Sequence, residues 1–192
     1  MRTRKQWLAL VAVVGLAGAW PAPAAAQLGI KAGLSFATLS NARPDWKTRT
    51  GFAAGLSLPF GSGPVTLQPE ALYVQKGVAA NGAPANTVPK LAYLDVPVLL
   101  KFSLPTMMVT PMAYAGPDVS FRLSCTTGDV DCNDTFKSTD WGVTLGAGVR
   151  LGGLTGLTIE GRYTWGLNDI HDVSAGVAAR TRTFLLLVGV SM

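Results

Sequence analysis

Apolar and polar residues alternate with a period of two along eight segments of the chain, and each run predicts a β-strand. The segments are residues 27–37, 50–60, 65–76, 91–104, 109–124, 139–152, 157–167 and 181–192. In VTLQPEALYVQK, residues 65–76, Glu70 and Lys76 fall on one parity and Ala71 and Tyr73 on the other. The segments are long for soluble strands and suit tilted strands that cross a bilayer in about 9–11 residues or slightly more.

Short and long connections alternate between these segments. The short ones, residues 61–64, the link around Pro105, and residues 153–156, carry turn-forming residues. The long, more polar ones are residues 38–49, 77–90, 125–138 and 168–180. This pattern, with both termini at the short-turn end, predicts an all-β fold, an eight-stranded antiparallel up-and-down β-barrel.

The two faces of the predicted strands differ in chemistry. One parity carries large apolar side chains such as Leu34, Phe52, Leu100 and Leu145, and the other carries charged residues and many glycines. The interior of an eight-stranded barrel is only just wide enough for side chains, so it cannot easily hold that many large residues. We therefore place the apolar face in lipid and predict a transmembrane barrel. A soluble, lipocalin-like periplasmic binder with an apolar cavity is the alternative.

The first 26 residues are typical of a secretory signal peptide. Arg2, Arg4 and Lys5 precede an uncharged stretch over residues 7–16, and residues 24–26 are all alanine. We expect cleavage after Ala26, which makes residues 27–192 the barrel domain.

An uncleaved N-terminal anchor is the alternative, but Pro21 and Pro23 interrupt the apolar stretch before it reaches the length of a membrane span. Cleavage would lower the formal charge from +5 to +2. No basic stripe suited to nucleic acid then remains. Charged residues form 14% of the chain, against about 25% in soluble domains.

The predicted lumen face carries acids and bases that can neutralise one another. They are Glu70, Asp95, Asp118 and Glu160, with Lys31, Lys76, Lys101, Arg122, Arg150 and Arg162. Because isolated charges are costly in a narrow lumen, we expect an ion-pair network between neighbouring strands. Glu70 would then face Asp95 or Lys101. Glu160 and Arg162 would meet Arg150.

Such a network would close the lumen and fix the strand register. A small charged channel or proton path is the alternative, although eight strands leave no room for a porin-like aqueous pore.

Aromatic residues gather near the loop-side ends of strands on the outward parity. They are Tyr73, Trp141, Tyr163 and Trp165. This placement predicts an aromatic girdle at the membrane interface.

Six motifs carry a resemblance to a known family: GIKAGLSFATL, GFAAGLSLPF, LQPEALYVQKG, LAYLDVPVLLKF, AYAGPDVSF and EGRYTWGLNDI. In this order they resemble the outer-membrane β-barrel domain family related to PorT-like proteins, among the OmpA-like eight-stranded barrels. The resemblance implies an outer-membrane barrel, mostly without an assigned molecular activity, and brings no catalytic residues. One departure is the final Val190-Ser191-Met192, because such barrels usually end in an aromatic residue read by the assembly machinery.

Cys125 and Cys132 lie in the third long connection. In an exported chain they predict a disulfide, worth about 2–3 kcal/mol for a loop of this size. A metal site that adds Asp129 or Asp131 lacks the usual set of four ligands, so we expect no metal.

His171 is the only histidine, and Asp169, Asp172 and Ser174 lie beside it. On paper they supply a catalytic group for an enzyme that acts on lipid at the loop rim. No spacing here guarantees the geometry of nucleophile, base and orienting group, so we interpret them as solvated loop residues.

The sequence therefore predicts a non-enzymatic integral protein of the bacterial outer membrane with a structural or loop-mediated binding role. We expect a monomer without a cofactor. Its expected partners are outer-membrane lipid and, during biogenesis, the barrel-assembly machinery.

Overall fold

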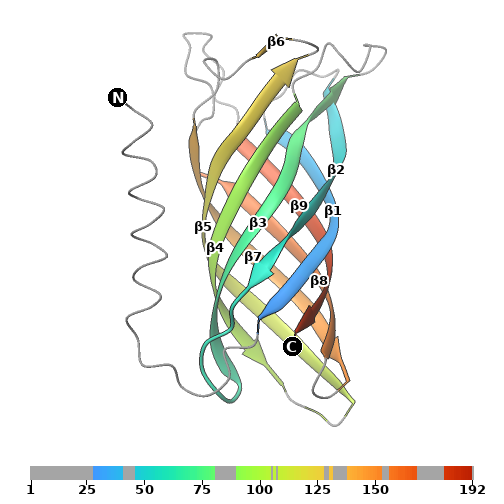
Figure 1. Ribbon diagram of the computed structural model, residues 1–192, viewed down its shortest axis with the longest axis vertical. Helices are drawn as coiled ribbons and strands as arrows, with labels where there is room; N and C mark the ends of the chain where they lie inside the picture. Colours follow the sequence, from blue (N-terminus) through green and yellow to red (C-terminus); the bar gives the residue numbers. More distant parts are fainter. Residues whose placement is uncertain are drawn as a thin grey trace.

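Eight long strands and one strand of two residues form a single antiparallel sheet that closes into a barrel (Figure 1). The strands are β1 Gly29–Ser40, β2 Trp46–Ser57, β3 Val65–Ala80, β4 Lys90–Ser103, β5 Val109–Thr127, β6 Val130–Asp131, β7 Thr139–Leu151, β8 Gly156–Gly166 and β9 Arg180–Ser191. Each long strand pairs with its neighbours in chain order, and β1 pairs with β9. The predicted fold class is confirmed.

The computed structural model describes residues 28–40, 46–80, 90–104, 106, 108–127, 130–131, 138–152, 156–167 and 180–191. Within these ranges, no helix has the length and apolar character needed to cross a membrane.

Several strands continue past their predicted ends on the long-loop side. β2 begins at Trp46, β3 reaches Ala80 and β5 reaches Thr127. The short β6 pairs with the end of β5, with Thr126 opposite Asp131, and lies at the upper end of the barrel in Figure 1. Alternation predicts a strand only where apolar and polar residues take opposite parities. The extensions WKTR, GVAA and CTT do not alternate in this way, so they carry no such signal.

The short connections bend tightly at the end of the barrel opposite β6. Gly61 and Gly63, between β2 and β3, have φ angles of 108° and 87°, and Gly152 after β7 has a φ of 87°. Glycine adopts this left-handed region without the steric cost that a Cβ imposes. These glycines allow tight turns after β2 and at the end of β7. At the same end of the barrel, the end of β9 pairs with the start of β1, with Gly29 opposite Ser191.

The outer surface of the barrel is apolar. Along β9, exposed and buried residues alternate at every position. The exposed set includes Phe184 and Leu186, whereas Leu185 and Leu187 are buried. On other strands, Leu100 and Leu145 are more than half exposed. A soluble lipocalin-like barrel needs the opposite arrangement, so the burial pattern excludes it and supports lipid contact.

We expect Leu145→Arg to destabilise the barrel strongly, because residue 145 lies at the middle of β7 and faces lipid. Arginine at the bilayer midplane costs about 2–4 kcal/mol. Unfolding in urea, followed by tryptophan fluorescence in lipid vesicles, measures the change in the free energy of unfolding.

Leu167→Arg is the matched control, because Leu167 is exposed just after β8 at the long-loop end. Its cost should be about 0–1 kcal/mol. Equal costs at the two positions would contradict the lipid-facing assignment of β7.

Candidate functional site

Four charged side chains form a closed ring across the lumen. Lys31 Nζ lies 2.7 Å from Glu70 Oε1 and 2.8 Å from Glu160 Oε2. Arg162 completes the ring, with Nη1 2.5 Å from Glu70 Oε2 and Nη2 3.0 Å from Glu160 Oε2. All four side chains are at most 5% exposed. We call these residues the charge ring; two cations alternate with two carboxylates, so its formal charge is zero.

Neutral side chains complete the hydrogen bonding of the ring. Gln68 Nε2 donates to Glu70 Oε1 at 2.5 Å, and the Tyr114 hydroxyl donates to Glu160 Oε2 at 3.1 Å. The Tyr114 ring also lies under the Arg162 guanidinium, 5.3 Å from its centroid. Charge-assisted hydrogen bonds of this kind are among the stronger ones in proteins. Both carboxylates are therefore fully engaged.

Glycines on neighbouring strands leave room for these long side chains. Lys31 stands between Gly55 of β2 and Gly189 of β9 in the strand register. Gly146 of β7 stands opposite both Tyr114 and Arg162, and a Cβ at Gly146 would overlap the Tyr114 ring. The glycines of the lumen face thus make space for large residues opposite them.

A second polar group lies nearer the long loops. Lys76 Nζ lies 2.9 Å from Asp95 Oδ1, donates to the Ser120 hydroxyl at 3.0 Å, and lies 4.9 Å from the centroid of the Tyr93 ring.

Asp118 lies in the same upper part of the lumen. The Thr144 hydroxyl donates to Asp118 Oδ2 at 3.2 Å and lies 2.7 Å from the Thr164 hydroxyl. Among the described residues, the other carboxylate oxygen of Asp118 has no hydrogen-bond partner. Asp118 is buried and accepts one hydrogen bond, from Thr144, so it is held less completely than the carboxylates of the charge ring.

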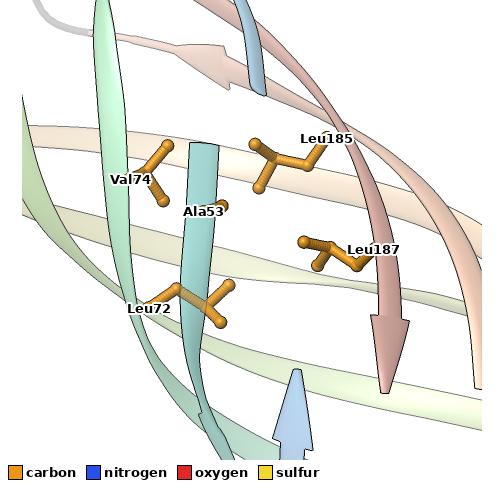
Figure 2. Close-up of a cluster of buried hydrophobic side chains, with 5 residues drawn as sticks. All are labelled: Ala53, Leu72, Val74, Leu185 and Leu187. Carbon is orange, nitrogen blue, oxygen red and sulfur yellow. The ribbon is translucent and has the colours of Figure 1, made fainter. Parts of the chain in front are cut away.

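An apolar cluster also lies inside the barrel (Figure 2). It comprises Ala53, Leu72, Val74, Leu185 and Leu187, each at most 2% exposed. Figure 2 shows the side chains from β2, β3 and β9 pointing toward one another across the lumen. Along β3, Leu72 and Val74 lie between Glu70 and Lys76. On β9, Leu185 and Leu187 stand opposite Arg162 and Glu160, so the cluster packs beside the charge ring.

The structure places eight of the ten predicted lumen residues at 4% exposure or less: Lys31, Glu70, Lys76, Asp95, Lys101, Asp118, Glu160 and Arg162. Arg122 and Arg150 are half-buried. The lumen set is therefore brought together, although Lys101 reaches only Gln68 Oε1, at 3.1 Å.

The predicted pairing partners were wrong. Glu70 pairs with Lys31 and Arg162 instead of with Asp95 or Lys101. The reason is the register: Leu72 stands opposite Asp95, and Gln68 stands opposite Leu99, so no β4 cation is level with Glu70.

Arg150 was likewise expected to meet Glu160. It stands opposite Thr158, one step nearer the short turns, whereas Glu160 stands opposite Gly148. Glu160 instead reaches across the lumen to Lys31. In a narrow barrel, long side chains at one height converge on the axis, so strands that are not neighbours supply the partners.

Parity reasoning did not single out Tyr114, Gln68 or the apolar cluster as parts of the lumen filling. Tyr114 and Gln68 lie on the lumen parity, so the alternation of apolar and polar residues could have predicted that both point inward. Leu185 and Leu187 lie in a run, residues 184–188, that is apolar on both parities, and this hides the inward pair.

The four predicted girdle residues lie on the outer face. Trp141 and Trp165 are exposed, and Tyr73 and Tyr163 are half-buried. The ring centroids of Tyr163 and Trp165 are 4.5 Å apart, and those of Tyr73 and Phe52 are 5.4 Å apart. Trp141 starts β7 and Trp165 ends β8, both at the long-loop end. A girdle role remains a prediction.

Some predicted residues lie outside the described part of the chain. These are the signal segment, Asp129, Cys132, Asp169, His171, Asp172 and Ser174. Cys125 is fully buried near the end of β5, and the Cys125–Cys132 disulfide stays a prediction. The described residues hold no group of three or more His, Cys, Asp or Glu side chains arranged to bind a metal.

The fold and its filled lumen define an integral membrane protein of the eight-stranded barrel class. The chain belongs to the outer membrane protein beta-barrel domain family, whose model matches residues 21–172. The protein is located in the bacterial outer membrane. Its short-turn end therefore faces the periplasm.

Three solved structures of other proteins are similar to this chain. The chain is similar to Neisserial surface protein A (NspA), with a TM-score of 0.57 and 18% identity over 86% of this chain and 96% of that chain. It is similar to the outer membrane enzyme PagL, with a TM-score of 0.52 and 13% identity over 84% and 97%.

The third is OprG from Pseudomonas aeruginosa, with a TM-score of 0.49 and 12% identity over 88% and 96%. No curated protein matches the chain significantly. At these identities the similarity shows a common fold alone.

We expect Glu70→Gln to destabilise the barrel by about 3–5 kcal/mol, because it leaves buried cations without their carboxylate. Arg162→Met should cost a similar amount. The double variant should cost less than the sum of the two by more than about 1 kcal/mol, since contacting residues couple. Urea unfolding of the four proteins measures this coupling energy.

Arg182→Met serves as the control partner, because Arg182 is exposed on the outer face of β9. Combined with Glu70→Gln, it should give additive costs. Additive costs for Glu70→Gln with Arg162→Met as well would contradict a coupled ring.

We expect Gly146→Val to destabilise the fold by about 1–3 kcal/mol or more, the usual cost of overpacking, because the new side chain overlaps the Tyr114 ring. Ala147→Val is the matched control, since Ala147 is exposed on the outer face. The shift between folded and heat-unfolded bands on gels, followed against temperature, compares the two. If Ala147→Val were less stable than Gly146→Val, the inward placement of Gly146 would be contradicted.

Proposed function

We propose that the protein is a non-enzymatic outer-membrane barrel whose role is structural or depends on binding through its long loops. The observation that carries this proposal is the charge ring, which closes the lumen with side chains from β1, β3 and β8. These strands are not adjacent in the sheet, so the ring joins separate parts of the barrel wall.

The lumen filling supports a closed barrel. Any water path along the axis would have to pass ring side chains that are at most 5% exposed. It would then meet the apolar cluster, which offers no hydrogen bonds to water or to an ion. An interior built in this way suits a rigid scaffold and does not suit conduction.

The chemistry open to the protein therefore lies at its ends and on its outer face. Outer-membrane lipid is the proposed partner of the apolar face, and the barrel-assembly machinery acts during biogenesis. The protein works as a monomer, with the long connections presented at the cell surface.

We expect the wild-type protein to show no unitary conductance steps in planar bilayers, because the charge ring blocks the axis. Tyr114→Ala combined with Arg162→Ala shortens one side chain of the charge ring and the tyrosine beside it. This double variant should open a leak, which proves that the assay detects an open lumen. Both proteins are first checked for the folded band on gels.

Unitary steps from the folded wild-type protein would overturn the closed-lumen proposal. The non-enzymatic part is tested separately by mass spectrometry of outer-membrane lipids. Lipid modified in cells that make the wild-type protein but not His171→Ala would overturn that part.

A further inference from the structure

The periplasmic mouth of the barrel contains a polar pocket below the charge ring. Its polar lining comes from Lys31, Ser57, Gln68, Lys101, Arg150 and Thr158, with Glu160 at its inner side. These residues stand near the short-turn ends of β1, β2, β3, β4, β7 and β8. The pocket therefore opens on the periplasmic side and is separate from the long loops.

Positive charge is in excess at this pocket. The two cations of the charge ring are matched by Glu70 and Glu160, which leaves Lys101 and Arg150. Among the described residues, no carboxylate lies within ion-pairing distance of either one; Lys101 Nζ reaches only the amide oxygen of Gln68, at 3.1 Å.

The carboxylates of the ring are bonded to other donors. Glu70 accepts from Lys31, Gln68 and Arg162. Glu160 accepts from Lys31, Arg162 and Tyr114. Neither carboxylate forms an ion pair with Lys101 or Arg150 among the described residues.

Lys101 is buried and Arg150 is half-buried with a buried Nε, so a counter-charge would stabilise both. Lys101 is 3% exposed. The Arg150 side chain crosses Gly156, where a Cβ would lie 2.6 Å from its Cδ. Its Nε is buried without a hydrogen-bond partner among the described residues. A buried cation without an anion is strongly unfavourable.

We propose that the mouth pocket binds a free small oxyanion, a carboxylate or phosphate, between Lys101 and Arg150. The guanidinium supplies the planar pair of donors that suits such an anion, and the ammonium supplies the second charge. Thr158, opposite Arg150 in the register, adds a hydroxyl donor. The bound anion neutralises the mouth just as Glu70 and Glu160 neutralise the ring.

Titration of the full-length folded protein in detergent with orthophosphate, in a chloride background, tests the site by calorimetry. We expect saturable binding to the wild-type protein and at least tenfold weaker binding to Arg150→Gln and to Lys101→Met. Arg150→Lys keeps the charge and should weaken binding less than Arg150→Gln. Phosphate should also raise the unfolding temperature of the wild-type protein more than that of Arg150→Gln.

Arg182→Gln is the matched control, because it removes an exposed arginine at the opposite end of the barrel; it should bind phosphate as the wild-type protein does. An equal loss in Arg182→Gln, unchanged binding in the two mouth variants, or no saturable binding by the wild-type protein would each overturn the proposal. The conductance result bears on the closed lumen and not on this site, so the two proposals can fail independently.

Discussion

The charge ring is the interaction on which the rest of the barrel depends. An eight-stranded cylinder has an interior that only side chains can fill, and strand pairing alone ties each strand only to its two neighbours. Lys31, Glu70, Glu160 and Arg162 connect walls of the barrel that share no backbone hydrogen bonds. Buried ion pairs often contribute little net stability. The value of the ring therefore lies in selecting one strand register and one cross-section from the many that the apolar outer face would tolerate.

The ring also explains why small and large residues are divided between the faces. Lipid accepts bulk anywhere on the outside, so Leu100 and Leu145 need no fitted partner. The interior has no such freedom. A tyrosine or an arginine that points inward needs a neighbour without a side chain, and Gly146 provides this space for Tyr114 and Arg162. The glycine content of the chain is thus a consequence of its filled lumen.

Most of the fold could be predicted from the sequence, because alternation reports directly which face of a strand meets lipid. The contacts inside the lumen could not. Glu70 and Asp95 lie on neighbouring strands, but the partner of Glu70 is Arg162, and that contact depends on how far the strands are staggered around the cylinder. The parity of residues along one strand does not depend on this stagger, so the contacts between strands cannot be predicted from it. Leu185 and Leu187 were overlooked for a different reason, since apolar residues occupy both parities there and the period of two vanishes.

The charged side chains of the lumen are satisfied to different degrees in its middle and toward its two ends. In the ring, two cations and two carboxylates balance one another in charge, although the Arg162 Nε has no hydrogen-bond partner among the described residues. Below it, Lys101 is buried and Arg150 is half-buried, and neither has a carboxylate within ion-pairing distance among the described residues; above it, the Asp118 carboxylate keeps one oxygen without a hydrogen-bond partner among them. Because unsatisfied polar groups are costly only where they are buried, these two places are where the interior can still respond to an ion. The charge ring lies between the Lys101 and Arg150 pair and Asp118. Because the ring residues are held by one another, an ion bound at one end of the lumen should not affect the other end by moving a charged side chain.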